Sequence, residues 1–236
     1  MSEGRIGSEH YDSSGYFEGE GARHLADPES PFQRYRVAKV VELARPRATD
    51  RVVDLGCGWG TFGFALADRV AEVVGVDFSE ASVAYCLRRL EAEPHANLRF
   101  VHADARSTGL EAGAWDLVLA ADLLEHLYPD DSVAVAAEAY RLLAPGGRVA
   151  VWTPHRGHVL EALKNRDILL ARDVTHVDYK SMDDTKRLLS DAGFTIERAY
   201  YAESHVPGLR VVERLLQPVV PFLRRRIAVL GRKPAR

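Results

Sequence analysis

The chain of 236 residues has little cysteine and no long apolar run. Its two cysteines, Cys57 and Cys86, are too few for a disulfide framework or a zinc knuckle, which indicates a reducing compartment. No apolar stretch approaches the roughly 20 residues that a membrane-spanning helix needs. The first ten residues are polar and lack the apolar segment of a secretory signal. We therefore predict a cytoplasmic protein with no stable membrane insertion.

An excess of positive charge is also missing. The formal net charge is -3, whereas a nucleic-acid-binding domain usually carries a basic surface. The length fits one domain with additions and is enough to bury a substantial core. We therefore expect no nucleic-acid partner, and the sequence leaves a homodimer open.

The most informative stretch is a glycine-rich loop within R-V-V-D-L-G-C-G-W-G, residues 51–60. A short apolar run predicts a buried strand that ends at Asp54, and residues 61–70 have the pattern of a helix. Gly56, Gly58 and Gly60 lie between them, where the backbone must turn sharply and a ligand can approach it without meeting a Cβ. In open α/β sheets, ligands bind at this junction.

The spacing of the glycines distinguishes two classes of ligand. A dinucleotide fingerprint is G-x-G-x-x-G, but here the spacing is G-x-G-x-G and Thr61 stands where the third glycine would fall. Asp54 would repel a phosphate and suits a ligand with a cationic amino group. An NAD-dependent oxidoreductase is therefore disfavoured, and a turn that binds no ligand is the alternative structural interpretation.

Acidic residues recur after the following strands. Residues 73–77 (V-V-G-V-D) predict a second strand that ends at Asp77, whose carboxylate can accept hydrogen bonds from both hydroxyls of a ribose. Capping of the next helix suits Ser79 better. A third strand, 98–102, precedes Asp104, and a fourth, from residue 115, leads to Asp122 and L-L-E-H-L. The run L-A-P-G-G then precedes a fifth strand, expected from residue 148.

From residue 51 to residue 151 this series resembles the class I S-adenosylmethionine-dependent methyltransferases. The L-E-H-L run resembles their small-molecule branch, which includes ubiquinone- and menaquinone-biosynthesis enzymes. The resemblance implies an α/β fold, a Rossmann-like doubly wound sheet of seven strands, mostly parallel with an antiparallel last strand. It also implies S-adenosyl-L-methionine as cofactor, S-adenosyl-L-homocysteine as product and a small-molecule acceptor.

The resemblance assigns roles to residues around the cofactor. In the family pattern the acid after the second strand binds the ribose. The acid after the third accepts from the adenine amino group, and the next backbone N–H reaches the ring. The predicted cofactor-binding residues are Asp54, Gly56, Cys57, Gly58, Gly60, Asp77, Phe78, Asp104, Ala105 and Asp122.

The remaining segments are expected to cover the site. Residues 1–45 form an N-terminal cap segment with a helix at 31–43, in which Tyr11 and Tyr16 are candidate substrate contacts, although a loose tail is as compatible with its composition. Residues 46–236 form the methyltransferase domain, with inserts at about 152–180 and 203–224. The second insert is apolar and adjoins R-R-R at 224–226. A membrane-surface role is the alternative there, but we favour a solvated edge.

Histidines are the expected catalytic residues. A hydroxyl acceptor benefits from a general base near neutral pKa, and we rank His176 first, His155 second and His126 third. We expect Glu125 to be exposed beside His126. His158 is assigned to the substrate. His155 and His158 together with an acid could bind a divalent metal, but two histidines without a firm third ligand are weak evidence, so no metal is predicted.

The sequence therefore predicts an S-adenosylmethionine-dependent methyltransferase that acts on a hydroxyl of a small molecule. The acceptor class would be a sugar, a quinone-like compound or a natural-product intermediate. Two alternatives stay open. One is an N- or C-methyltransferase, and the other is a non-catalytic S-adenosylmethionine-binding protein.

Overall fold

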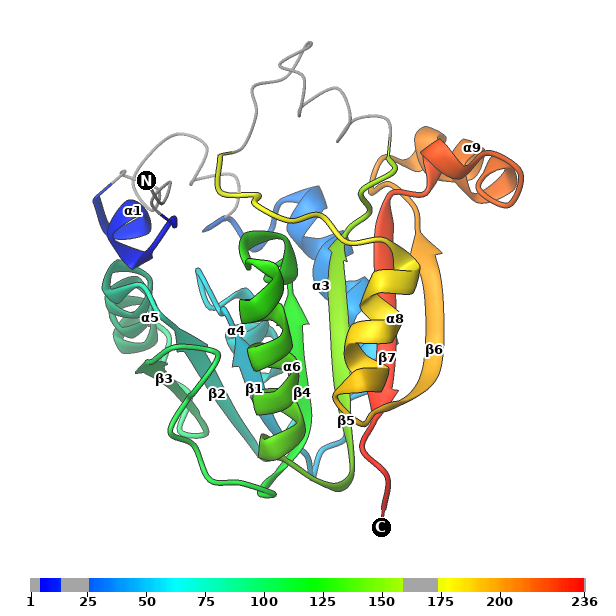
Figure 1. Ribbon diagram of the computed structural model, residues 1–236. Helices are drawn as coiled ribbons and strands as arrows, with labels where there is room; N and C mark the ends of the chain where they lie inside the picture. The colour runs from blue at the N-terminus through cyan, green and yellow to red at the C-terminus, as the bar shows by residue number, and fades with distance from the viewer. Residues whose placement is uncertain (1–4, 14–25, 159–173, 236) are drawn as a thin grey trace.

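The computed structural model describes residues 5–13, 26–158 and 174–235. A seven-stranded sheet with the order β3-β2-β1-β4-β5-β7-β6 forms its centre (Figure 1). The strands are β1 (Arg51–Leu55), β2 (Glu72–Asp77), β3 (Leu98–His102), β4 (Trp115–Ala121), β5 (Leu143–Pro154), β6 (Thr195–Ala202) and β7 (Arg226–Arg232).

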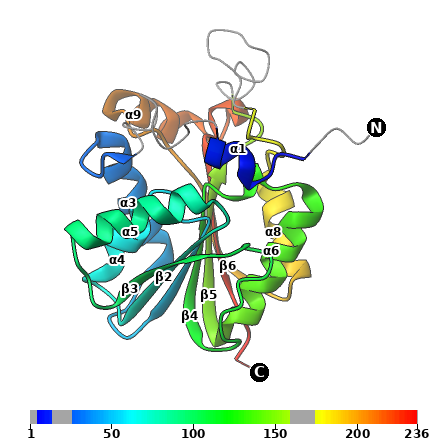
Figure 2. The same cartoon turned by 90° about the vertical axis from the view of Figure 1, so that its left-hand side faces the viewer.

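Helices cover both faces of the sheet (Figure 1 and Figure 2). Apolar side chains of α3, α4 and α5 pack in the core cluster on one face, and those of α6 and α8 pack in the cluster on the other. The helical segments are α1 (Ser8–Ser13), α3 (Pro31–Ala44), α4 (Thr61–Ala67), α5 (Glu80–Ala92), η1 (Leu124–His126), α6 (Pro129–Leu142), α8 (Met182–Asp191), α9 (Pro207–Leu216) and η2 (Pro221–Leu223).

The strand directions confirm the predicted fold class. β1 pairs with β2 and β4, β2 with β3, and β4 with β5, all in parallel. β7 lies between β5 and β6 and is antiparallel to both. The carboxyl ends of β1 to β5 therefore meet at one edge, drawn at the top of Figure 1, where α1 and α9 also lie.

The central strands are buried on both faces, which explains their continuous apolar runs. Val52 and Val53 of β1 alternate between the two core clusters, as Val73 and Val74 of β2 do. These four side chains are fully buried. Period-two alternation of polar residues is absent from these described strands because neither face meets water.

Two predicted boundaries need correction. α4 ends at Ala67 and not at residue 70, because the Arg69 N–H bonds the Leu66 carbonyl and tightens the last turn. β5 begins at Leu143 and not at residue 148, because Leu143 already pairs with Trp115 of β4 ahead of the two glycines. Within the described residues, no helix combines the length and apolar character that crossing a membrane requires.

Candidate active site

The three glycines of the loop have different roles. Gly56 and Gly60 have φ of +69° and +70°, and a Cβ there would lie 2.8 Å from Cδ1 of Leu123 and 2.9 Å from Cζ of Phe100, so backbone conformation and close packing both favour glycine. A Cβ on Gly58 would meet no described atom within 4 Å, although φ is +51° there. Gly58 is therefore the position where the loop backbone borders open space and a ligand can approach it.

Asp77 holds the glycine loop against the start of α5. Its Oδ2 accepts from the Gly58 N–H at 2.8 Å, and its Oδ1 accepts from the Ser79 N–H at 3.0 Å. Ser79 caps α5, since its hydroxyl accepts from the Ser82 N–H, as predicted. Burial raises the pKa of Asp77, and the two backbone N–H groups oppose that rise. Each carboxylate oxygen keeps a lone pair that a ribose hydroxyl could use.

Asp54 carries a buried polar atom that lacks a partner. Its carboxyl group is 1 % exposed, and its Oδ2 makes no hydrogen bond to any described residue. Burial raises the pKa of Asp54 to about 7, and Arg36 opposes that rise. A buried carboxylate oxygen without a donor is costly, so this residue fits a cationic amino group placed beside it.

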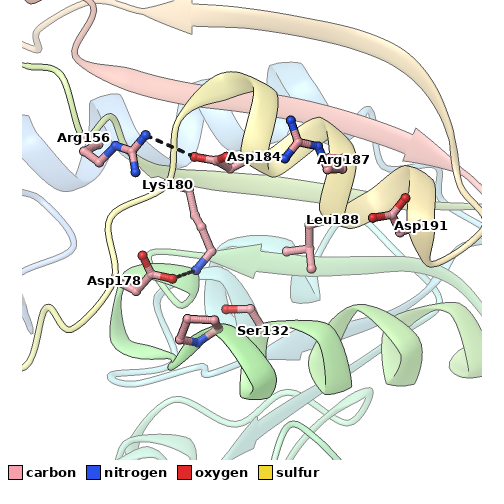
Figure 3. Close-up of a pocket in the computed structure, with 9 residues that line it drawn as sticks. Ser132, Arg156, Asp178, Lys180, Asp184, Arg187, Leu188 and Asp191 are labelled. Atoms are coloured by element: carbon pink, nitrogen blue, oxygen red, sulfur yellow. Dashed lines mark hydrogen bonds and ion pairs between the residues drawn. The ribbon is translucent and has the colours of Figure 1, made fainter.

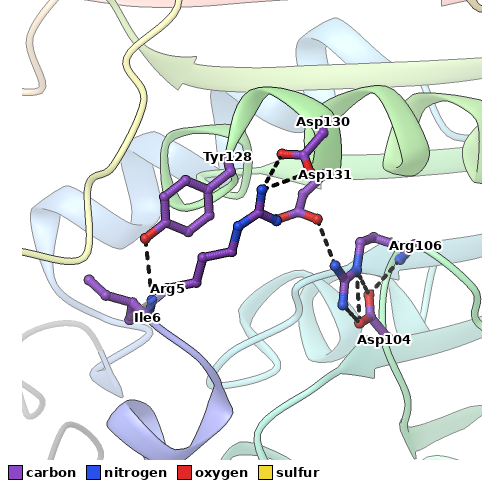
Figure 4. A network of polar contacts seen from close by, with 7 residues as sticks. All are labelled: Arg5, Ile6, Asp104, Arg106, Tyr128, Asp130 and Asp131. Atoms are coloured by element: carbon purple, nitrogen blue, oxygen red, sulfur yellow. Dashed lines mark hydrogen bonds and ion pairs between the residues drawn. The ribbon is translucent and has the colours of Figure 1, made fainter. Parts of the chain in front are cut away.

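The adenine side of the predicted site contains a network of ion pairs (Figure 4). Arg106 bonds both oxygens of Asp104 and also Asp131, which in turn pairs with Arg5 of the N-terminal segment. Arg106 lowers the pKa of Asp104. An adenine amino group would have to share Asp104 with Arg106. Phe78, the residue after β2, is 37 % exposed.

Other predicted cofactor contacts have their side chains turned to the protein. Cys57 is buried, and its side chain packs in the core cluster with residues of α4 and α5. Ala105 packs against the core beneath α6. At both positions the side chain has a structural partner, so any contact with the cofactor would be to backbone atoms.

Asp122 is bound on both sides by arginine. It follows β4 with φ of +55°, and its carboxylate oxygens accept from Arg36 Nε and Arg226 at 2.6 Å each. Burial alone would raise the pKa of Asp122, but Arg226 and Arg36 outweigh burial and hold it below its usual value. This pairing joins α3, β4 and β7 under the site, so the Asp122 side chain serves the framework.

Two of the candidate histidines lie together at the carboxyl edge. The rings of His126 and His176 have centroids 4.7 Å apart and meet edge to face. The Tyr11 hydroxyl lies 3.2 Å from Nδ1 of His126, and the Tyr179 hydroxyl lies 2.6 Å from Nδ1 of His176. The Tyr11 ring also contacts Phe78, at 5.4 Å between centroids. The N-terminal helix α1 thus connects the cofactor loops to the histidine pair.

Glu125 is buried, which contradicts the expectation that it is exposed. It is 1 % exposed, because its backbone carbonyl accepts from Val177 and its Oε2 accepts from the Thr153 hydroxyl at 2.9 Å. Burial, together with the nearby charge of Asp122, raises its pKa to about 8. Glu125, His126 and His176 each offer one possible metal-ligand atom, and these atoms lie within 4.8 Å of one another.

The remaining predicted residues lie elsewhere or outside the described chain. Nδ1 of His155 lies 2.9 Å from the Arg224 carbonyl oxygen, and its ring packs edge to face on Tyr201. Burial lowers the pKa of His155. His158 is buried, with Nε2 4.0 Å from a Glu213 oxygen. Both lie with residues of β6, α9 and the approach to β7. Tyr16 lies outside the described residues.

A cavity of about 340 Å³ opens between α6 and α8 (Figure 3). Its lining is mostly charged, and Lys180 reaches across it to Asp178 at 2.5 Å. No residue of the glycine loop lines it. This cavity is therefore separate from the predicted cofactor site.

Sequence reasoning missed Arg36, Glu125 and Tyr179. Arg36 lies within a predicted helix that carried no motif. Tyr179 follows His176 by three residues and could have been noticed as a partner, because both stand in a short polar segment between predicted elements. The burial of Glu125 depends on contacts with residues 153 and 177, which no local pattern reveals.

Comparison with known proteins agrees with this geometry. Residues 52–147 match the family described as methyltransferase domain. The demethylmenaquinone methyltransferase of Thermus thermophilus is 37 % identical over 115 residues, 48 % of this chain and 51 % of that protein. A probable S-adenosylmethionine-dependent methyltransferase of Mycolicibacterium smegmatis is 31 % identical over 173 residues, which are 73 % of this chain and 62 % of that protein. The ubiquinone biosynthesis O-methyltransferase of Bordetella avium is 35 % identical over 137 residues, which are 55 % of this chain and 56 % of that protein. The chain thus spans about half to three fifths of these relatives' lengths.

Solved structures share the fold at lower identity. A phosphoethanolamine N-methyltransferase of Haemonchus contortus, in complex with S-adenosyl-L-methionine, gives a TM-score of 0.71 at 18 % identity and covers 99 % of this chain and 61 % of its own. A SAM-dependent methyltransferase of Archaeoglobus fulgidus has a TM-score of 0.65 at 19 % identity, and the match covers 85 % of this chain and 92 % of that one. The [4+2]-cyclase SpnF has a TM-score of 0.68 at 18 % identity, and the match covers 89 % of this chain and 85 % of that one. The fold alone therefore does not define the reaction.

The fold, the glycine loop and the sequence relatives together define the class. The chain carries a class I S-adenosylmethionine-dependent methyltransferase domain, and S-adenosylmethionine is the cofactor of that class. Its sequence relatives include small-molecule enzymes named for ubiquinone and menaquinone biosynthesis.

Proposed function

We propose that the protein transfers a methyl group from S-adenosylmethionine to a hydroxyl of a small molecule, with the His126–His176 pair receiving the proton. The bound cofactor supplies an electrophilic methyl carbon, and the protein supplies alignment and proton handling. The observation that carries the proposal is the approach of these two rings, 4.7 Å between centroids, with Tyr11 contacting both His126 and Phe78.

Three residues of the site fit the cofactor. The unpartnered Oδ2 of Asp54 would accept from its amino group, and the open side of Gly58 would let it approach the loop. Asp77 would accept from the ribose hydroxyls with the lone pairs that its two N–H donors leave. We assign adenine contacts to Phe78 and to Asp104 shared with Arg106.

The histidine pair is arranged to accept a proton. Nδ1 of His126 lies 3.2 Å from both the Thr175 carbonyl oxygen and the Tyr11 hydroxyl. A carbonyl can only accept and a hydroxyl can also accept, so we assign the proton to Nδ1. The lone pair then resides on Nε2. His176, bonded through Nδ1 to the Tyr179 hydroxyl, is our first choice for the base and His126 our second.

Substitution of His176 tests this assignment. We expect His176→Asn to lower kcat by roughly 100-fold or more, the usual contribution of a general base, while S-adenosylmethionine affinity measured by calorimetry changes less than about twofold. The assay is S-adenosylhomocysteine release with a panel of phenols, quinols and sugars. His95→Asn is a matched control, because His95 packs edge to face on Phe64 of α4.

Each outcome separates the alternatives. An unchanged rate in His176→Asn would point to an acceptor that needs no base, such as a neutral amine. Cofactor binding without turnover on any acceptor would favour the non-catalytic S-adenosylmethionine-binding protein. Loss of cofactor binding in the variant would show that His176 belongs to the cofactor site.

A further inference from the structure

The helix α9 has its polar side buried and its apolar side exposed. From residue 206 to residue 222, the two buried side chains are Glu213 and Gln217, one helical turn apart. The apolar residues of α9 and the segment after it face solvent, and Leu215 is 70 % exposed and Val219 75 %. A surface helix normally buries its apolar side against the core and exposes its polar side. In α9 the polar side is buried and the apolar side is exposed.

Polar contacts fix this orientation. The Glu213 carboxylate accepts from the Ser204 N–H and lies 3.9 Å from an Arg225 nitrogen. Arg210 donates to the carbonyls of Ser204 and His205. The helix is therefore attached through its polar side, and its apolar side is left for another partner.

Eight large apolar side chains between residues 206 and 222 are exposed, and together we call them the α9 patch. Single exposed apolar residues are common on a soluble surface, whereas a group of them marks a site of protein or membrane contact. Its members are Val206, Leu209, Val211, Val212, Leu215, Leu216, Val219 and Phe222.

The charge around the α9 patch selects the partner. The arginines at the surface beside the α9 patch are Arg214, whose side chain is 63 % exposed and pairs with Glu203, and Arg224, which donates to the Pro218 carbonyl. The one acid between residues 206 and 226, Glu213, is buried. An apolar helix face bordered by arginine is the pattern of a helix that lies in the interface of an anionic bilayer. A symmetric contact between two copies of this chain would instead bring arginines together.

The patch also lies at the functional edge of the molecule. β6 leads into α9, and the chain returns through β7, which pairs with β5. Figure 1 and Figure 2 place α9 at the edge of the sheet where α1 lies. We propose that the α9 patch docks the protein on the surface of an anionic lipid bilayer, with the apolar side chains entering the interface and Arg214 and Arg224 facing the headgroups.

Vesicle flotation of the full chain tests the proposal. We expect co-flotation with vesicles of phosphatidylglycerol and phosphatidylcholine, weaker binding to phosphatidylcholine alone, and a decrease at high salt. In the double variant Val212→Glu/Leu215→Glu, partition should fall by about tenfold or more, because one buried apolar side chain is worth roughly that factor.

A matched variant controls for added charge and for folding. Leu87→Glu/Val133→Glu replaces exposed apolar residues of α5 and α6 and should float as the original chain does. Cofactor binding and the unfolding midpoint should be the same in both variants. Equal loss of flotation in both variants, no flotation of the original chain, or a dimer that Val212→Glu/Leu215→Glu dissociates would each overturn the proposal.

Discussion

The buried carboxyl group of Asp54 makes the stability of the cofactor-free protein depend on pH. Burial raises its pKa from the ordinary value of 3.8 to about 7. A carboxyl group whose pKa is higher in the folded state stabilises the fold while it is protonated. That stability is fully present below pH 4, is lost as the pH rises towards 7, and changes little above 7.

The size of the effect follows from the two pKa values. Between the unfolded-state pKa and the folded-state pKa, each pH unit of increase lowers the free energy of unfolding by about 1.4 kcal/mol. The raised pKa of Asp54 therefore lowers the stability of the fold by about 1.6 kcal/mol at pH 5 and by about 4 kcal/mol at pH 8. Asp54→Asn removes this cost while keeping the shape of the side chain.

Urea unfolding of the cofactor-free proteins measures the effect. We expect the stability of Asp54→Asn relative to the original chain to increase by about 2 to 3 kcal/mol between pH 5 and pH 8. Strain or lost hydrogen bonds in the variant would be the same at both pH values and cancel in this difference. A difference that does not change with pH would refute the assignment of a near-neutral pKa to Asp54.

Two further predictions concern the cofactor and a metal. Asp77→Ala should weaken S-adenosylmethionine binding by about 2–3 kcal/mol through the loss of charge-assisted hydrogen bonds, whereas Asp68→Ala, at an exposed acid, should leave calorimetric affinity unchanged; equal affinities would remove Asp77 from the ribose site. Methyl transfer should persist after treatment with chelator, because we assign His126 and His176 to proton transfer. Loss of the rate with recovery on added divalent ion would make these two residues and Glu125 metal ligands.

The sequence predicted the fold well because the signals for it are local. The glycine loop, the acid that ends β2 and the apolar runs of β1, β2 and β4 each depend on neighbouring residues. Asp77 illustrates this, since its place after a strand and before a capped helix follows from residues 73–82.

The site was predicted less completely because its geometry depends on distant residues. Glu125 is buried by Thr153 and by the segment at Val177, so its environment cannot be inferred from L-E-H-L. Asp122 is occupied by Arg36 and Arg226, which come from opposite ends of the chain. Sequence spacing places such residues at an edge of the sheet but does not say which ones meet.

The orientation of α9 shows the same limit in another form. The apolar composition of residues 206–223 is visible in the sequence, and the expectation there was a solvated edge. Which side of the helix is buried is decided by Glu213 and its contacts with Ser204 and Arg225. Composition alone cannot distinguish an apolar helix that covers the site from one that presents its apolar side outward.

The most direct test of the account is calorimetric titration of the full chain with S-adenosylmethionine, S-adenosylhomocysteine and NAD. We predict saturable binding of the first two and none of NAD, because Asp54 suits an amino group and repels a phosphate. Binding of NAD without binding of S-adenosylmethionine would contradict the assignment of the glycine loop and the methyltransferase function with it.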